Sequence, residues 1–188
     1  MVTEPLSKAG ATEIIFPLIM SEMGIFFRHS KTMAKFKGSF KNLALSSVSL
    51  IEKEAVVREI EAIIEQKFLQ YCDPGIPVQI LLRRISRIGF GRIRLATRHP
   101  CHYPTGVEMR QEEKEKVFAI CLDMIEQENA LYQIDYLRRF HWFIDHTFQV
   151  DALVYLINEL RHNFLGPLVD RAWANIAAVF DHHPPGYC

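Results

Sequence analysis

The sequence predicts an all-α protein, an irregular array of about six to seven helices. Apolar residues recur at helical spacing in several long segments, and proline or glycine separates one segment from the next. Hydrophobic residues make up 49% of the 188 residues. A chain of this length buries about 70% of the surface that its unfolded form exposes. We therefore expect a single helical domain over residues 11–183, between a flexible lead-in at 1–10 and a frayed tail at 184–188.

The first segment, residues 12–27, combines helical spacing with a proline. Its apolar face is formed by Ile15, Ile19, Met23, Phe26 and Phe27. Pro17 either kinks this helix or marks its first turn. The next stretch, 28–47, is rich in lysine and serine and contains no acidic residue. We expect a solvated basic loop there; the alternative is a nuclear-import or phosphate-binding patch, which the interspersed Met, Phe and Ser residues disfavour.

A capping box is predicted to start the next helix. Ser49 and Glu52 are spaced so that each side chain can accept a hydrogen bond from the other's free backbone N–H group. The helix is expected to run to Tyr71, where the turn at residues 72–75 ends it. Its predicted core face consists of Ile51, Ala55, Ile60, Ile63, Ile64 and Phe68.

The following helix carries an unusual concentration of arginine. Pro77 is expected to start it and His99 to end it, because Pro100 disfavours helical geometry in the residue before it. No acidic residue occurs between Ile76 and His99. At 100° per residue, several arginines fall within about 60° of one another. They are Arg83, Arg87, Arg94 and Arg98.

This basic face has two interpretations. It could contact DNA or a nucleotide, or it could pair with acidic neighbours, each exposed pair adding about 0.2–1 kcal/mol. Pairing is favoured, because the adjacent predicted helices are rich in glutamate: Glu52, Glu54, Glu59, Glu61 and Glu65 on one, and Glu112, Glu113 and Glu115 on another. Lys+Arg and Asp+Glu both total 22, so net charge gives no general attraction to nucleic acid.

The second half of the chain is predicted to contain the remaining helices. An acidic-faced helix at 109–129 should bury Val117, Phe118, Cys121, Leu122 and Ile125. The next helix has an apolar face of Val150, Leu153, Val154, Ile157 and Leu160, and a polar arc of Asp151, Tyr155, Asn158, Glu159 and His162. Gly166-Pro167 then starts a helix with the face Leu168, Ala172, Trp173, Ile176, Val179 and Phe180. Residues 131–181 form the most apolar long segment, so we expect the chain to be organised around them.

No catalytic or metal-binding signature is found in the sequence. It has no Gly-x-Ser-x-Gly elbow, Walker loop or His-Glu-x-x-His helix. The four cysteines are far apart, with no Cys-x-x-Cys pair, which favours a reducing compartment. The loop at residues 99–102 offers His, Cys and His but no fourth ligand, so no metal site is expected. His141 and His146 lie about 140° apart around a helix and do not share a face.

Two other groups of residues could form a site. Asp151, Glu159 and Asp170 could approach one another in space, which their spacing does not establish. Aromatic residues are concentrated in the C-terminal part and could line a ligand pocket, although at helical spacing core packing is favoured. The candidates are Trp142, Phe148, Tyr155 and Trp173. The longest apolar run, at residues 14–20, contains a proline and falls far short of the ~20 residues that cross a bilayer, so no membrane contact is expected.

Several blocks of the sequence resemble one known family. They are FQVDALVYLINELRHNFLGPLVDRAWANIAAVFDHHP at 148–184, CDPGIPVQILLRRISRIGFGRIRLATRHP at 72–100, EKEKVFAICLDMIEQENALYQ at 113–133 and GATEIIFPLIMSEMG at 10–24. Together they resemble the later half of the fungal-specific transcription factor domain, the helical regulatory region that follows the six-cysteine zinc cluster in fungal transcription factors. Family members often have Trp-His just after Phe-Gln, where this chain has Val150-Asp151.

The resemblance implies a module within a larger helical regulatory domain that controls gene expression. It implies a nuclear location, a protein partner or small-molecule effector, and a homo-oligomer as one option. The six-cysteine cluster is absent from this sequence, so the resemblance implies no cofactor here and no direct specific DNA contact. Two alternatives remain open: a small helical enzyme or ligand-binding protein of a biosynthetic pathway built on the same scaffold, or an incomplete gene fragment. Without the resemblance, a cytoplasmic location is expected.

Overall fold

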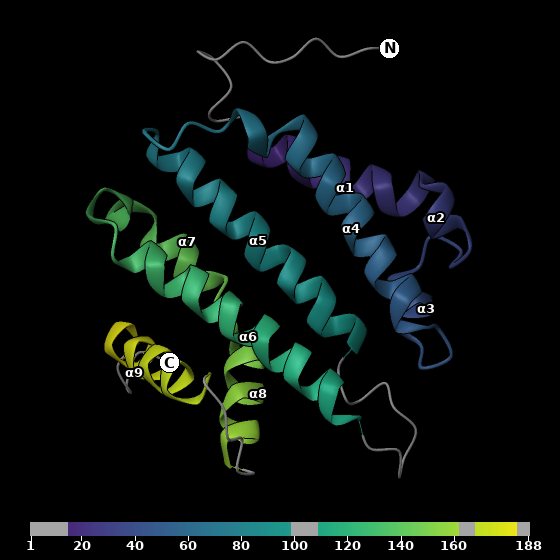
Figure 1. The fold of residues 1–188 in the computed structure, drawn as a ribbon. Helices are drawn as coiled ribbons and strands as arrows, with labels where there is room; N and C mark the ends of the chain where they lie inside the picture. The colour runs from purple at the N-terminus through teal and green to yellow at the C-terminus, as the bar shows by residue number, and fades with distance from the viewer. Residues whose placement is uncertain (1–14, 99–108, 162–167, 184–188) are drawn as a thin grey trace. The chain divides into compact units, whose positions relative to one another are not determined.

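The computed structural model describes residues 15–98, 109–161 and 168–183, and within these ranges the protein is all-α, as the sequence predicts (Figure 1). No strand occurs in these ranges. The α-helices are α1 (Ile15–His29), α2 (Lys31–Ala34), α3 (Phe40–Ala44), α4 (Leu50–Lys67), α5 (Pro77–Arg98), α6 (Gln111–Tyr132), α7 (His141–His146), α8 (Val150–Arg161) and α9 (Val169–His182). Two 3-10 helices are η1 (Leu69–Tyr71) and η3 (Asp135–Phe140).

The described ranges contain more helices than the sequence predicts, because α2, α3 and α7 are short. The first two lie in the stretch predicted as a basic loop, and α7 follows the 3-10 helix η3. Some predictions concern residues outside the described ranges: the lead-in at 1–10, the loop at 99–104, His162, the Gly166-Pro167 turn and the tail at 184–188.

The chain divides into two compact units that share α5. One unit comprises Met1–Arg83 and Ala96–Pro104, and the other comprises Arg84–Leu95 and Thr105–Cys188. The two ends of α5 therefore belong to the first unit and its middle to the second.

In the first unit, the starts of α1 and α4 follow local sequence signals. Pro17 lies in the first turn of α1, where a missing N–H group removes no intrahelical bond. The predicted capping box is present at α4: the Glu52 N–H donates to Ser49 Oγ at 3.2 Å, and the Ser49 N–H donates to Glu52 Oε2 at 3.3 Å. These local signals therefore fix both helix starts.

The buried face of α4 differs from the predicted one. Ile51 is 83% exposed, and Ala55 is also exposed. The core positions are instead Lys53, Val56, Val57, Ile60 and Ile64. The prediction was right for Ile60, Ile64 and Phe68 and wrong for the first turn, where a lysine replaces the isoleucine in the core.

Lys53 is buried because helix ends supply acceptors for its ammonium group. Its Nζ donates to the carbonyl oxygen of Ala44 at 3.2 Å and to that of Thr97 at 2.8 Å. Ala44 is the last residue of α3, and Thr97 lies in the last turn of α5. Carbonyl groups at such positions lack an intrahelical partner. The lysine therefore ties three segments of the first unit together.

The stretch predicted as a solvated basic loop is instead folded around α2 and α3. The Thr32 N–H donates to Ser30 Oγ at 3.1 Å and caps α2. Met33 and Leu43 are both 0% exposed. Between the two helices, Lys37 and Gly38 have positive φ angles of 52° and 63°, a backbone conformation that allows a tight reversal of the chain.

The second unit is organised around α6, which packs against α7, α8, α9 and η3 (Figure 1). All of its predicted core residues are buried: Val117, Phe118, Cys121, Leu122 and Ile125. The segment predicted to organise the chain, residues 131–181, supplies the described partners of α6: η3, α7, α8 and α9. Gly91 of α5 also approaches α6 closely, since a Cβ atom there would lie 2.5 Å from Met124 Cγ.

The predicted face of α8 is wrong. Val150 and Val154 are 54% and 59% exposed. The buried residues are Ala152, Tyr155 and Leu156, so the tyrosine assigned to the polar arc lies in the core. In α9, Ala172, Ile176 and Val179 are buried as predicted, whereas Trp173 and Phe180 are about half exposed at 49% and 50%.

None of the described helices is both long enough and apolar enough to span a membrane.

Candidate functional site

Ionisable side chains from three helices of the second unit converge around Tyr132, the last residue of α6. Its hydroxyl group bonds to Asp145 Oδ1 and lies 3.1 Å from His183 Nε2. Two further imidazole rings contact the phenol ring: that of His182 stacks on it with 4.4 Å between centroids, and that of His141 lies at 4.8 Å. We call this group, together with Glu128, the Tyr132 cluster.

Helical spacing explains how each element contributes to the cluster. Glu128 and Tyr132 are four residues apart on α6, and His141 and Asp145 are four apart on α7, so each pair shares a helix face. Thr147 ends α7 with bonds from its N–H and Oγ1 to the carbonyl groups of the last turn. The remaining two histidines lie at the C-terminal end of α9.

The hydrogen bonds at Tyr132 have a defined direction. An ionised Asp145 can only accept, so the single phenol proton is donated to that carboxylate. The bond to His183 must then run from its Nε2–H group to the phenol oxygen, which fixes the tautomer of a neutral His183 ring. Burial and the bond to Asp145 raise the pKa of Tyr132 above its ordinary value. The result is a linear relay from imidazole through phenol to carboxylate.

Glu128 is the most deeply buried acid of the cluster. It is 2% exposed, and neither carboxyl oxygen has a hydrogen-bond partner of normal geometry among the described residues. Burial raises the pKa of Glu128 to about 8, an effect only partly opposed by the Gln149 backbone N–H and reinforced by the charge of Asp145. The group is therefore a neutral carboxylic acid at pH 7.

His182 of the cluster is less basic than an exposed histidine. Burial, and then the neighbouring His183, lower the pKa of His182. His141 Nε2 is also buried without a hydrogen-bond partner among the described residues. His146, five residues later, is exposed, so the two histidines of α7 do not share a face.

The chemistry open to these groups is limited. Among the described residues, no group of three or more His, Cys, Asp or Glu side chains has a geometry that could hold a metal ion. Burial raises the pKa of Cys121 to about 12 and that of Cys72 above its usual value, so neither thiol is an activated nucleophile. The arrangement can relay a change in protonation between helices; it offers no nucleophile paired with a base.

The aromatic residues predicted to line a pocket or the core lie in different environments. Trp142 is 69% exposed and contacts Phe143 edge-on at 5.7 Å. Phe148 packs against the His183 ring at 4.6 Å, beside the Tyr132 cluster. Tyr155 is buried, and Trp173 is half exposed. Of these four residues, Phe148 is the one with a described ring contact to a member of the Tyr132 cluster.

Asp151, Glu159 and Asp170, which the sequence suggested as a possible carboxylate group, are not joined by any described contact. Asp151 and Asp170 are exposed and Glu159 is half-buried, and none of them forms a hydrogen bond or ion pair with another described residue.

The arginines of α5 are also in different environments. Arg98 is 6% exposed and its Nη2 lies 2.8 Å from Glu54 Oε2. Arg83 lies 3.5 Å from Glu65. Both partners are glutamates of α4, the pairing that the sequence predicts. Arg94 is half-buried and makes contacts of its own, and Arg87 is exposed.

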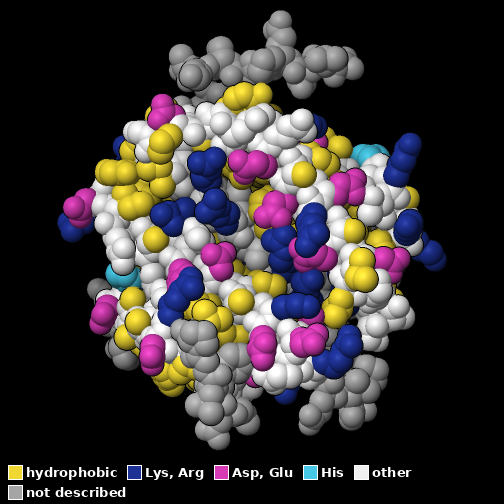
Figure 2. Space-filling model, viewed as in Figure 1, with side chains coloured by type: hydrophobic (Ala, Val, Ile, Leu, Met, Phe, Trp, Pro, Cys, Tyr) yellow, Lys and Arg dark blue, Asp and Glu magenta, His cyan; other side chains and the backbone are white. Residues whose placement is uncertain are grey.

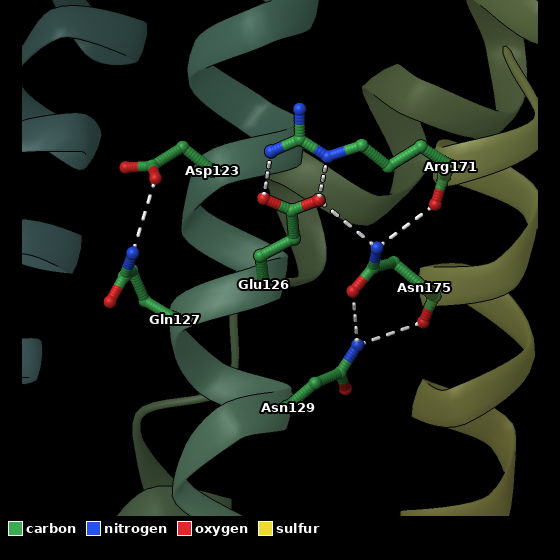
Figure 3. Close-up of polar contacts among 6 residues, drawn as sticks. All are labelled: Asp123, Glu126, Gln127, Asn129, Arg171 and Asn175. Carbon is green, nitrogen blue, oxygen red and sulfur yellow. Dashed lines mark hydrogen bonds and ion pairs between the residues drawn. The ribbon is translucent and has the colours of Figure 1, made fainter. Parts of the chain in front are cut away.

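A second polar network joins α6 to α9 (Figure 3). Arg171 forms a two-pronged ion pair with Glu126, and the Asn175 amide donates to the same carboxylate at 3.2 Å. Deeper in the interface, Asn129 Nδ2 donates to the backbone oxygen and to Oδ1 of Asn175 at 3.0 and 3.1 Å. These bonds fix the register of α9 on α6, and α9 in turn carries His182 and His183 into the Tyr132 cluster.

Sequence reasoning identified neither the Tyr132 cluster nor the α6–α9 network. Their hydrogen-bonded pairs lie up to 51 residues apart in the sequence. The available signal was weak: an Asn four residues after Ile125, in line with the predicted core face, and histidines at the end of the last helix.

No protein-family model matches the chain, and no solved structure matches it. Among curated proteins, it is 26% identical over 183 residues to the aurofusarin cluster transcription factor aurR2 of Gibberella zeae, an alignment covering 97% of this chain and 27% of that protein. It is 25% identical to the transcriptional regulator AacuB of Aspergillus aculeatus, over 92% of this chain and 23% of the regulator. It is 26% identical to the transcriptional regulator nsrM of Aspergillus novofumigatus, over 94% of this chain and 25% of that regulator.

The chain thus spans about a quarter of the length of the curated relatives that it matches. The resemblance inferred from the sequence blocks is confirmed: this chain is homologous to a segment of fungal transcription regulators, two of them named for a cluster, aurofusarin and pyriculol/pyriculariol biosynthesis.

Proposed function

We propose that this chain is a regulatory domain of a fungal transcription regulator and controls the expression of biosynthetic genes. The observation that carries the proposal is the match to regulators over 92–97% of the chain. The alignment includes almost every described helix, so the relatives are expected to share this arrangement and not just one motif.

The described side chains support regulation over catalysis. In the Tyr132 cluster, the carboxyl group of Glu128 is neutral and the phenol of Tyr132 is protonated. The free cysteines among the described residues are buried. A catalytic group needs both access to substrate and a pKa near the working pH. Glu128 has the second property without the first, since it is only 2% exposed.

The domain is proposed to act in the nucleus by binding a protein partner or a small effector. No cofactor is expected for this chain. The polar interfaces of the second unit can support such a role, because binding that alters one helix would be felt by the others through the Tyr132 cluster.

A reporter assay tests the proposal. The chain is fused to a heterologous DNA-binding domain, and reporter transcription is compared with that of the DNA-binding domain alone. We expect at least a severalfold change, which Ile125→Asp abolishes because Ile125 is 0% exposed. Glu115→Gln, at an exposed position of the same helix, should leave the effect unchanged. A fluorescent fusion should accumulate in nuclei. Two results together would contradict the proposal: a well-expressed fusion that leaves reporter transcription unchanged, and a deletion of the gene for this protein that leaves the transcripts of biosynthetic genes unchanged.

A further inference from the structure

We infer that the segment 28–41 of the first unit presents a basic surface that contacts the phosphate backbone of duplex DNA without reading its sequence. The inference rests on the proposed function, under which the protein works beside DNA. The basic surface is defined by Arg28, Lys31, Lys35, Lys37 and Lys41.

The charge of this surface is of one sign. No aspartate or glutamate occurs between Glu22 and Glu52 in the sequence. The chain as a whole has a formal net charge of +0, so the basic surface is a local excess of positive charge and not a reflection of composition. A local field of this kind attracts polyanions even when the net charge of the protein is zero.

The cations of the basic surface are exposed and unpaired. All of them are solvent-exposed, and none forms an ion pair or hydrogen bond through its side chain with a described residue. The two nearby carboxylates are already engaged: Glu22 pairs with Lys67 at 2.6 Å, and Glu59 accepts a bond from Ser30 Oγ at 3.3 Å. On the face drawn in Figure 2, acidic and basic side chains lie close to one another over much of the surface.

The backbone that carries these lysines is ordered by contacts of its own. Asn42 Nδ2 donates to the Phe36 carbonyl at 3.0 Å across the reversal between α2 and α3. The ring of Phe27, at the end of α1, meets that of Phe40 edge-on at 6.1 Å. Met33, in the same segment, is 0% exposed. The backbone positions that carry the lysines are therefore set before binding, which reduces the entropy lost in ordering the segment when a partner is bound.

The chemistry of the segment suits phosphate better than bases. Lysine acts as a point charge and contacts phosphate without geometric demands, whereas base reading needs bidentate arginine or amide groups. The one amide, on Asn42, is already bonded to the backbone, and Arg28 is the one arginine. Duplex DNA offers a charge every ~1.7 Å along its axis, a density that an acidic protein segment rarely matches.

Fluorescence anisotropy with labelled duplexes of two unrelated sequences tests this inference. The test variant combines Lys31→Gln, Lys35→Gln, Lys37→Gln and Lys41→Gln. The control combines Lys116→Gln, Arg138→Gln, Arg139→Gln and Arg161→Gln, which removes the same charge from exposed positions of the second unit. Circular dichroism confirms that both variants remain folded.

Wild type and control should bind both duplexes equally, with affinity falling steeply between ~50 and ~200 mM salt. Each lysine that contacts a phosphate contributes about 0.9 to the slope of log affinity against log salt. The test variant should therefore lose up to about 3.6 in this slope and bind at least tenfold more weakly at ~50 mM.

Three results would overturn the inference. The first is an equal loss of DNA affinity in the test and control variants. The second is no binding by the wild type at low salt. The third is competition by poly-glutamate as strong as that by duplex DNA of equal charge, which would identify an acidic protein as the partner. The proposed function is tested separately, because a fusion that regulates the reporter, combined with no DNA binding by the unfused chain in the anisotropy assay, would remove only this inference.

Discussion

Replacing Glu128 by glutamine should change how the stability of the protein depends on pH. The carboxyl group is 2% exposed, and burial raises its pKa to about 8 from an ordinary value of 4.5. Glutamine has nearly the same shape as the neutral acid but cannot ionise. The substitution therefore removes one titration and leaves the packing of α6 against its neighbours almost unchanged.

The sign follows from proton binding. Between pH 4.5 and about 8, folded Glu128 keeps a proton that the unfolded chain has lost. The stabilisation from this group is complete below the unfolded pKa and is lost as pH rises through the folded one. Each unit of pH within the window costs up to about 1.4 kcal/mol, so between about pH 5 and about pH 8 the wild type should lose roughly 3–4 kcal/mol that the variant keeps.

Urea denaturation followed by circular dichroism, at several pH values, measures the effect. The lowered pKa of His182 acts in the opposite direction, but this histidine is present in both proteins and cancels in their difference. A constant offset caused by the new amide also cancels. Glu115→Gln serves as the control, because Glu115 is exposed on the same helix, and it should follow the wild-type curve. If Glu128→Gln and the wild type give parallel curves, Glu128 is not held neutral and the reasoning about the Tyr132 cluster is wrong.

Three other predictions concern packing and polar contacts, each measured by urea denaturation. Gly91→Ala should lower the free energy of unfolding by about 1–3 kcal/mol, because the new Cβ atom would press on Met124 of α6. Gly89→Ala should raise it by about 0.5–1 kcal/mol, because a Cβ atom there has nothing within 4 Å. Equal effects of the two substitutions would contradict the close approach of α5 to α6 at Gly91. Asn129→Ala, at a buried position, should cost about 1–3 kcal/mol. Arg171→Ala should cost clearly less, because Arg171 is exposed and an exposed ion pair adds little; the reverse order would show that the outer ion pair holds α9. Lys53→Met should cost about 1–3 kcal/mol by leaving two buried carbonyl groups unbonded; an unchanged midpoint would mean that water replaces the ammonium group.

The buried face of α6 could be predicted because one pattern dominates it. Its apolar positions, from Val117 to Ile125, have strongly acidic and basic residues on the opposite side, and the helix is surrounded by partners in its own unit. In that situation the hydrophobic stripe and the packing surface coincide.

The face of α8 could not be predicted in the same way, because its neighbours decide it. The helix packs against both α6 and α9, and Ala152, at 0% exposed, allows a close approach that a larger residue would prevent. Tyr155 is buried because its aromatic ring is apolar, although it also carries a polar hydroxyl group. A count of apolar residues places Val150 and Val154 inside, although they face away from these neighbours.

The candidate site was hidden for a related reason. Each of its residues is ordinary in sequence: a glutamate and a tyrosine near one helix end, a histidine and an aspartate on a short helix, and two histidines where the last helix stops. Their meaning appears only when α7 and α9 both reach the end of α6. Spacing rules relate residues within one helix and say nothing about which helix ends meet.

The polar residues in the core help to define how the helices of this protein pack. Apolar contacts alone tolerate shifts in register, whereas Lys53, Glu128 and Asn129 each have a place set by groups on other segments. Burying such groups costs stability, and that cost is often retained at catalytic centres. Here the cost falls at helix junctions, where no nucleophile or metal geometry occurs among the described residues. Junctions that hold helices in one arrangement, and that contain a buried ionisable group such as Glu128, suit the regulatory role proposed above.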